Sequence, residues 1–269
     1  MTVSPHALDA AVALTPAGEH RFTGQTHPTY ANMVGPFGGT IAATLLNGAL
    51  SHPERLGEPL SLTVHYAAPI ADGAFEVHAR PMRTNRSTQH WLVELRQDDA
   101  VAAFATVMTA MRRDTWSATD AVFPSVPPAA QLPRHPGVFR TAWPKAYDMR
   151  FTDGEQVLDS VERDDAVTQV WIRDEPPRPL DFLSLSAICD AFIPRIFVRR
   201  SRPVPAGTVT LTVYFHADAA LLAAQGSEHV LGCAKGLRYS QGFHDQTAEI
   251  WSARGDLLAV GHQVVYFKE

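Results

Sequence analysis

The chain of 269 residues contains only two cysteines, Cys189 and Cys233, and neither belongs to a CxxC pair. No secretory leader with an apolar core opens the sequence. Unpaired cysteines without a leader are typical of reducing compartments, so we expect a cytoplasmic protein. No stretch approaches the roughly 18 consecutive apolar residues of a membrane-spanning helix, and we therefore expect no membrane span.

Clustered positive charge is also scarce. The formal net charge is −5, and the Lys and Arg residues are scattered apart from Arg199, Arg200 and Arg202. A nucleic-acid-binding surface needs a broad basic patch. We therefore expect no nucleic-acid partner, and we interpret the three arginines as a solvated basic turn.

Several catalytic signatures are missing from the sequence. It contains no GxSxG, HExxH, GxxxxGK[ST] or GxGxxG motif. Twelve histidines are present, but none is spaced with cysteines or acids in the way that metal ligands are. We expect neither a metal nor another cofactor.

The sequence does contain an internal repeat. Residues 62–66 (LTVHY) return as residues 211–215 (LTVYF), and residues 82–95 share a common offset with residues 237–250. Val101-Ala102-Ala103 then matches Leu257-Leu258-Ala259 one residue later. A period this long indicates two fused modules rather than a solenoid.

The repeat predicts three segments. We expect an N-terminal domain over residues 1–113, a linker rich in Pro, Ala and Ser over residues 114–145, and a C-terminal domain over residues 146–269 that carries the catalytic residues.

Each module is predicted to contain one apolar helix followed by antiparallel strands. In the first half, a helix over residues 39–50 precedes strands over residues 60–70, 74–81, 89–97 and 100–112. In the second, a helix over residues 183–197 precedes strands over residues 207–217, 229–239, 247–253 and 257–268, with one or two opening strands within residues 147–172. A helix that is apolar on nearly every side suits enclosure by a curved sheet.

These patterns predict an α+β double hot-dog, in which a long helix of each module is wrapped by an antiparallel sheet. We expect approximate twofold symmetry and two sheets joined edge to edge, because exposed strand edges favour pairing. A homo-oligomer would then form through other surfaces.

Asp190 stands out within the second apolar helix. Its neighbours Cys189 and Ala191 are apolar, and burial of an unpaired carboxylate costs several kcal/mol or more. Pro194 cannot donate an amide hydrogen bond, so the helix should kink or end nearby. The residues alone fit an active-site acid and a structural acid equally well.

Two further polar residues replace apolar residues of the first copy. Thr208 stands where the first copy has Pro59, and Gln263 where it has Val107. Strand alternation predicts that Thr208 shares one face with the following threonines at positions 210 and 212. A carboxylate, a hydroxyl and a carboxamide brought together could bind a water molecule, with the carboxylate as its base.

The second half resembles the catalytic half of the acyl-CoA thioesterase II family, whose members are double hot-dog proteins. The family has an Asp on the second helix, a Thr six residues before an aromatic-Phe-His triplet, and a Gln four residues after an Ala in the last strand. Asp190, Thr208 before residues 214–216 (YFH), and Gln263 after Ala259 match these features. Residues 35–39 (GPFGG) resemble the family's entry to the first helix.

The resemblance implies a hydrolase that cleaves acyl-CoA to a carboxylic acid and CoA. Asp190 would accept a proton from water, while Thr208 and Gln263 hold that water. Gly38 and Gly39 would contact the substrate, and the amides near them or near Leu185 are candidate oxyanion donors. The two glycines fit a tight loop entering a crowded helix equally well.

Two alternatives remain. A hot-dog dehydratase or hydratase would need a histidine for proton transfer, and His27 or His90 could be nominated, although neither lies in a family-like motif. An acyl-CoA-binding protein without activity would keep an apolar tunnel but would not need the water-holding trio.

Overall fold

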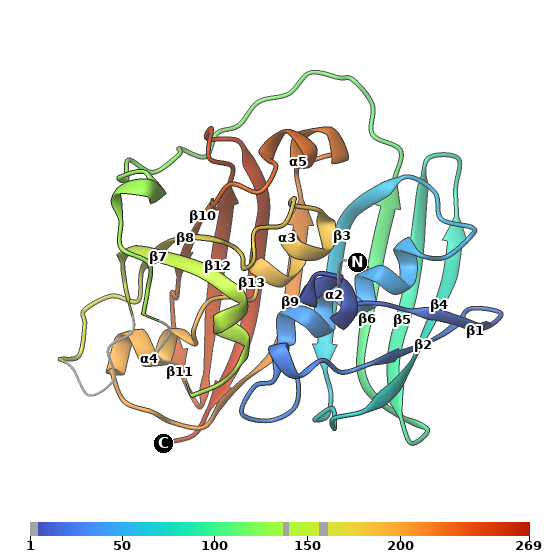
Figure 1. Cartoon of the computed structure of the whole chain (residues 1–269), viewed down its shortest axis with the longest axis horizontal. Coiled ribbons are helices and arrows are strands. Elements are labelled where there is room, and N and C mark those ends of the chain that lie inside the picture. Colours follow the sequence, from blue (N-terminus) through green and yellow to red (C-terminus); the bar gives the residue numbers. More distant parts are fainter. Residues whose placement is uncertain (1–4, 137–139, 156–160) are drawn as a thin grey trace.

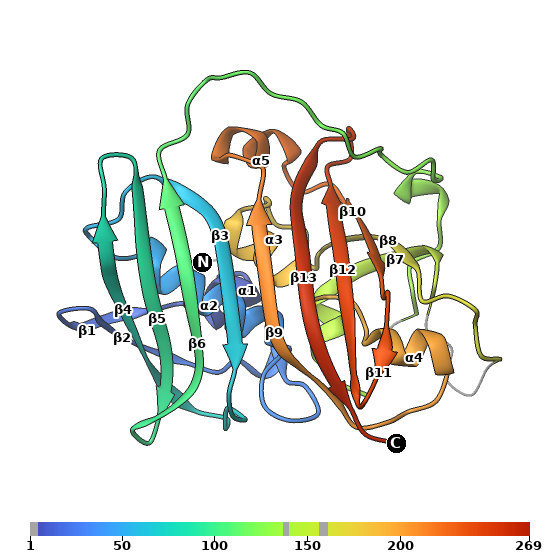
Figure 2. The same ribbon diagram turned by 180° about the vertical axis from the view of Figure 1, so that it is seen from behind.

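The computed structural model describes residues 5–136, 140–155 and 161–269. A single antiparallel sheet of 13 strands curves around the central helices (Figure 1). The reverse view shows its outer face, where no helix covers the central strands (Figure 2). This architecture confirms the expected α+β double hot-dog fold.

The first half opens with elements that the repeat did not predict: α1 (Ala7–Ala11), β1 (Thr15–Gly18), β2 (Arg21–Gln25) and the 3-10 turn η1 (Pro28–Tyr30). The predicted helix follows as α2 (Gly38–Leu50). The four predicted strands are β3 (Glu58–Tyr66), β4 (Ala74–Thr84), β5 (Thr88–Gln97) and β6 (Ala100–Ala110). Ten of the 13 residues of α2 are buried, as an enclosed helix requires.

The second half begins with the 3-10 turns η2 (Ala129–Gln131) and η3 (Trp143–Ala146), followed by β7 (Tyr147–Asp153) and β8 (Thr168–Asp174). Residues 156–160 of the range expected to hold the opening strands lie outside the described residues. The remaining elements are α3 (Phe182–Ile188), α4 (Arg195–Arg200), β9 (Ala206–Phe215), α5 (Ala219–Gln225), β10 (Val230–Lys235), β11 (Tyr239–Ser240), β12 (Phe243–Trp251) and β13 (Leu257–Phe267).

The strand order is the same in both halves. Counted outward from the centre, the first half runs β3, β6, β5, β4, β2 and β1, and the second runs β9, β13, β12, β10, β8 and β7. Strand β3 pairs with β9, which joins the two halves edge to edge.

The centre of this junction is a pair of equivalent residues. Thr63 faces Thr212, and their hydroxyl oxygens lie 3.1 Å apart. On either side, Leu62 pairs with Val213 and Val64 pairs with Leu211. Leu62 corresponds to Leu211 in the repeat, and Val64 corresponds to Val213. The two flanking pairs are therefore equivalent, and an approximate twofold axis passes between the two threonines.

The predicted helix over residues 183–197 is wrong in its length. Helix α3 ends at Ile188, a turn follows, and α4 begins at Arg195 directly after Pro194. Proline lacks an amide hydrogen and cannot continue a helix that precedes it, so it can only open a new one. The expected kink or end near Pro194 is confirmed.

The segment between the two repeats is ordered where the structure describes it. The indole of Trp171 donates to the Pro127 carbonyl at 2.9 Å, and Phe123 packs edge-on against Trp251. These contacts cover an apolar cluster of β8, β10 and β12 on the outer face of the sheet. Residues 123–132 therefore pack as a strap on the second half. The predicted domain boundaries at residues 113 and 146 remain a prediction.

Candidate active site

Asp190 lies in the turn that follows α3, not within a helix as the sequence predicted. Its backbone amide donates to the Ala187 carbonyl at 3.1 Å, and Cys189 caps the helix. Only 8% of Asp190 is exposed. The turn before Pro194 thus directs a carboxylate into the interior between the two halves.

The carboxylate is bound by an amide from the last strand. Gln263 on β13 donates through Nε2 to Asp190 Oδ1 at 2.5 Å. The Oε1 atom of Gln263 accepts in turn from Nε2 of Gln246 on β12, at 2.8 Å. The structure therefore brings together two of the three predicted catalytic residues and adds a third polar residue that the prediction omitted.

Gln246 could have been found from the repeat. At the offset that aligns Glu94 with Glu249, Trp91 of the first copy corresponds to Gln246. The sheet confirms this alignment, because Trp91 pairs with Val107 just as Gln246 pairs with Gln263. A buried Trp–Val pair of one half is thus a pair of amides in the other.

Gly38 and Gly39 form the first turn of α2 and lie against the same carboxylate. A Cβ atom on Gly38 would lie 2.6 Å from Asp190 Oδ2, and one on Gly39 would lie 2.5 Å from the Ala187 carbonyl oxygen. A side chain at Gly39 would collide with the backbone of α3, whereas one at Gly38 would displace the Asp190 carboxylate. Tyr66 donates to the Gly38 carbonyl at 2.9 Å and fixes this end of the helix.

The environment raises the pKa of Asp190 from 3.8 to about 7. Loss of hydration on burial is the dominant cause, because it disfavours the charged carboxylate. The hydrogen bond from Gln263 and the backbone amide of Gly39 oppose that effect and lower the pKa. A carboxylate with a pKa near neutrality is suited to take a proton and give it back.

Thr208 lies on the same face of the sheet as Gln263, but for a reason that strand alternation misses. A bulge in β9 pairs Thr208 with Val265 and Thr210 with Val264. Because Val265 shares its face with Gln263, the bulge turns Thr208 inward while Thr210 and Thr212 face outward. The expectation that the three threonines share one face is wrong.

Among the described residues, the Thr208 hydroxyl has no hydrogen-bond partner, and it does not contact Asp190 or Gln263 through a hydrogen bond. The first half has the same bulge, where Pro59 pairs with Thr109. The backbone geometry is thus shared by both halves, and only the second half places a hydroxyl there.

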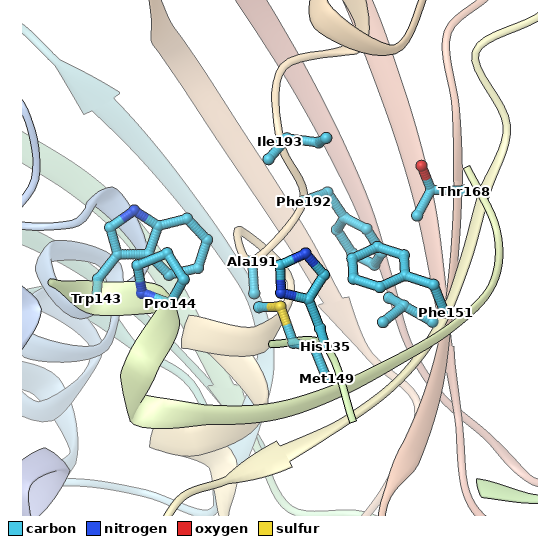
Figure 3. A pocket seen from close by; sticks show the side chains of 10 residues that line it. His135, Trp143, Pro144, Met149, Phe151, Thr168, Ala191, Phe192 and Ile193 are labelled. Atoms are coloured by element: carbon cyan, nitrogen blue, oxygen red, sulfur yellow. The ribbon is translucent and has the colours of Figure 1, made fainter. Parts of the chain in front are cut away.

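An apolar pocket is lined in part by the residues that directly follow Asp190 in the chain, and Figure 3 shows its lining side chains. The pocket is narrow and partly open to solvent. It is lined by His135, Trp143, Pro144, Met149, Phe151, Thr168, Val170 and the three residues after Asp190, namely Ala191, Phe192 and Ile193. Trp143 also stacks on Phe37, the residue before Gly38, with ring centroids 4.2 Å apart.

Other nominated residues lie elsewhere. The amide of Leu185 donates to the Asp181 carbonyl at 2.9 Å, so it belongs to the helix ladder and is not a free oxyanion donor. His27 accepts from the Thr29 amide and lines a separate pocket beside α2. His90 is exposed on β5. Neither histidine shares the hydrogen-bond network of Asp190.

Within residues 5–136, 140–155 and 161–269, no group of three or more His, Cys, Asp or Glu side chains could hold a metal ion. In the same part of the chain, no helix is long and apolar enough to cross a membrane. Cys189 is buried, and burial raises the pKa of its thiol well above the ordinary range. A thiol held in its neutral form is a poor nucleophile, as expected from its apolar neighbours.

Two family descriptions match most of the chain. Residues 27–111 match the acyl-CoA thioesterase N-terminal domain, and residues 123–267 match the acyl-CoA thioesterase C-terminal domain. A search among curated proteins found no match.

Solved structures share the whole fold. A conserved hot dog fold protein of unknown function from Alicyclobacillus acidocaldarius is 49% identical, with 99% of each chain covered and a TM-score of 0.94. The tesB protein of Mycobacterium avium subs paratuberculosis is 19% identical, with 97% of this chain and 98% of that chain covered and a TM-score of 0.78. Acyl-CoA thioesterase II TesB2 from Mycobacterium marinum is 17% identical over the same shares, with a TM-score of 0.76.

Proposed function

Because this chain belongs to the acyl-CoA thioesterase family and is a thioester hydrolase, we propose that its substrate is acyl-CoA. Its products would be a free carboxylic acid and CoA, and Asp190 would activate the water molecule that cleaves the thioester. The observation that carries the proposal is the buried carboxylate with a pKa of about 7, held by Gln263 at the entry of α2. A group that binds a proton near neutrality can act as base and then as acid within one turnover.

In the proposed reaction, ionised Asp190 takes a proton from water as the water oxygen attacks the thioester carbonyl carbon. The carbon–sulfur bond of the resulting tetrahedral intermediate then breaks. Asp190 returns its proton to the departing sulfur, which leaves as the CoA thiol. Atoms and charge balance without a cofactor or a covalent enzyme intermediate.

Gln263 and Thr208 are assigned to position the water. The Gln263 amide holds Oδ1 of the carboxylate, and we assign Oδ2 as the atom that takes the proton from water. Thr208 lies inward on the adjacent strand and its hydroxyl bonds to no other residue that the structure describes, so it has hydrogen-bonding capacity for a water molecule or for the thioester.

The first turn of α2 is assigned to stabilise the oxyanion. Helix N-termini present amides without acceptors and a partial positive charge, and both favour developing negative charge. The Gly39 amide already donates to the Asp190 carboxylate, so the Gly38 amide is the candidate donor to the oxyanion. The apolar pocket beside Ala191 and Phe192 would hold the acyl chain.

The test is release of free thiol from a panel of acyl-CoAs of increasing chain length, measured with and without exhaustive chelation of metals. Thiol release that survives chelation and disappears in Asp190→Asn supports the proposal. Release that needs added metal, or that is equal in the variant, contradicts it. Double-bond formation without thiol would instead identify a dehydratase, and tight binding without turnover an acyl-CoA-binding protein.

A further inference from the structure

The amide of Gln263 can serve Asp190 in only one of its two orientations. While Asp190 is ionised, the amide nitrogen donates to the carboxylate, whereas the amide oxygen would repel it if the amide were rotated by half a turn. Both orientations occupy the same volume, so packing alone selects neither. A polar group that binds the oxygen end would add to the preference that the carboxylate itself imposes.

That group is the side chain of Gln246. Its Nε2 donates to Gln263 Oε1 at 2.8 Å, and only 2% of Gln246 is exposed. Gln246 and Gln263 are directly opposed on β12 and β13, so the strand register brings their side chains together on the inner face. An amide nitrogen has no acceptor capacity, and it therefore binds the oxygen end of Gln263 and rejects the nitrogen end.

Gln246 is a poor residue for stability alone. Its Oε1 atom is buried and has no hydrogen-bond partner in the described part of the chain. A buried unpaired carbonyl oxygen destabilises a fold, and the first half has Trp91 at this position, which fills the space with an apolar ring. The polar pair is present only in the half that carries Asp190.

We propose that Gln246 is a positioning residue that fixes the orientation of the Gln263 amide so that its nitrogen faces the Asp190 carboxylate. Gln246 acts through Gln263 and does not touch the reacting atoms. The inference rests on the proposed function of Asp190 as the base, and it adds a positioning residue on β12 to the site.

The test is a double-mutant cycle with methionine, which resembles glutamine in size and shape but donates no hydrogen bond. We expect Gln246→Met to lower kcat about tenfold with little change in KM, because the freed amide spends part of its time in the wrong orientation. Gln246→Met combined with Gln263→Met should be no slower than Gln263→Met alone, since orientation is irrelevant once the amide is gone. Additive losses would overturn the proposal.

A second readout separates positioning from mere core filling. The Gln263 hydrogen bond lowers the pKa of Asp190, so its loss should move the pH midpoint of kcat upward in Gln246→Met and in Gln263→Met alike. Gln89→Met is the matched control. Gln89 is buried in the first half and bonds to Glu54, Leu56 and Thr84, so its replacement should lower the melting temperature without moving the pH midpoint.

If Gln246→Met does not fold, Gln246→Leu provides the same comparison. A folded variant with a native kcat and a native pH midpoint would show that Gln246 is structural. An inactive wild-type protein would instead refute the proposed function. In that event, NMR titration of the Asp190 carboxyl carbon in wild type and Gln246→Met still decides the positioning role, because it needs no turnover.

Discussion

Nε2 of Gln263 lies 2.5 Å from Oδ1 of Asp190, so strand β13 and the turn after α3 meet at one hydrogen bond. The other carboxylate oxygen lies over Gly38, at the start of the helix of the opposite half. The acid therefore depends on three segments that are far apart in sequence. The position of the Asp190 carboxylate is therefore set by contacts from both halves.

Asp190→Asn should lower kcat by roughly two to four orders of magnitude, the range typical of a positioned acid–base group. The amide keeps the shape of the carboxyl group but cannot take a proton from water. Folding should survive, because asparagine avoids the cost of a buried charge. Thiol release and melting temperature, measured on the same sample, check both expectations.

A structural acid would give the reverse pattern. The melting temperature would then fall while hydrolysis per folded molecule stayed near the native value, and that result would falsify the assignment of Asp190 as the base.

The pH dependence of turnover should follow the ionisation of Asp190. Since the proton acceptor is the ionised carboxylate, kcat should rise with pH and level off above a midpoint near the pKa of about 7. A profile of kcat against pH for one saturating acyl-CoA measures this midpoint. A midpoint near 4, the ordinary value for aspartate, would contradict the buried environment seen here.

Stability should depend on pH in the opposite direction. The folded protein binds the Asp190 proton more tightly than the unfolded chain does, because the pKa is about 7 when folded and 3.8 as the ordinary value. The free energy of unfolding should therefore fall as the pH rises from about 4 to about 7, and the contribution of this one group is on the order of 4 kcal/mol.

Asp190→Asn removes that contribution and isolates it from other titrating groups. Denaturant unfolding of both proteins at about pH 5 and about pH 8 should show the variant gaining stability relative to wild type at the higher pH. An unchanged difference between the two proteins at both pH values would indicate that the carboxylate is hydrated or paired in solution.

The repeat was sufficient to predict most of the fold. Leu62 and Leu211 begin similar strand patterns, and their alignment predicted both modules; the expected edge-to-edge junction is made by β3 and β9, which the sequence did not single out. The repeat could not predict α1, α5 or the first two strands, because these segments have no matching counterpart in sequence. Nor did the apolar pattern of residues 183–197 show where α3 ends, since buried turns and buried helices are equally apolar.

The site was predicted less completely. Asp190 and Gln263 were recognisable as polar residues in apolar surroundings, and the structure joins them. The inward orientation of Thr208 depends on a bulge in β9. A bulge adds one residue to a strand, so side chains two positions apart no longer point to the same face. Gln246 lies in an ordinary polar run and becomes notable only when it is compared with Trp91.

Gly38→Ala should greatly reduce turnover while leaving the fold intact. The added Cβ would lie 2.6 Å from Asp190 Oδ2, so the carboxylate or the start of α2 must shift by several tenths of an ångström. Gly261→Ala is a matched control on β13, where the nearest atom to a new Cβ is 3.7 Å away. Equal kcat values in the two variants would show that the contact with Gly38 is not required.

Thr208→Ala and Gln263→Ala should each reduce turnover by less than Asp190→Asn, because each leaves the base in place. We propose that both side chains hold the same water molecule, although Thr208 is not hydrogen-bonded to the other two residues in the structure. If so, the loss in the double variant should be smaller than the product of the single losses, since residues that act as a unit share one transition state.

Thr210→Ala is the matched control, because Thr210 is on the same strand but faces outward. Independent losses that multiply, or an effect of Thr210→Ala equal to that of Thr208→Ala, would remove Thr208 from the catalytic set and leave Asp190 with its two glutamines.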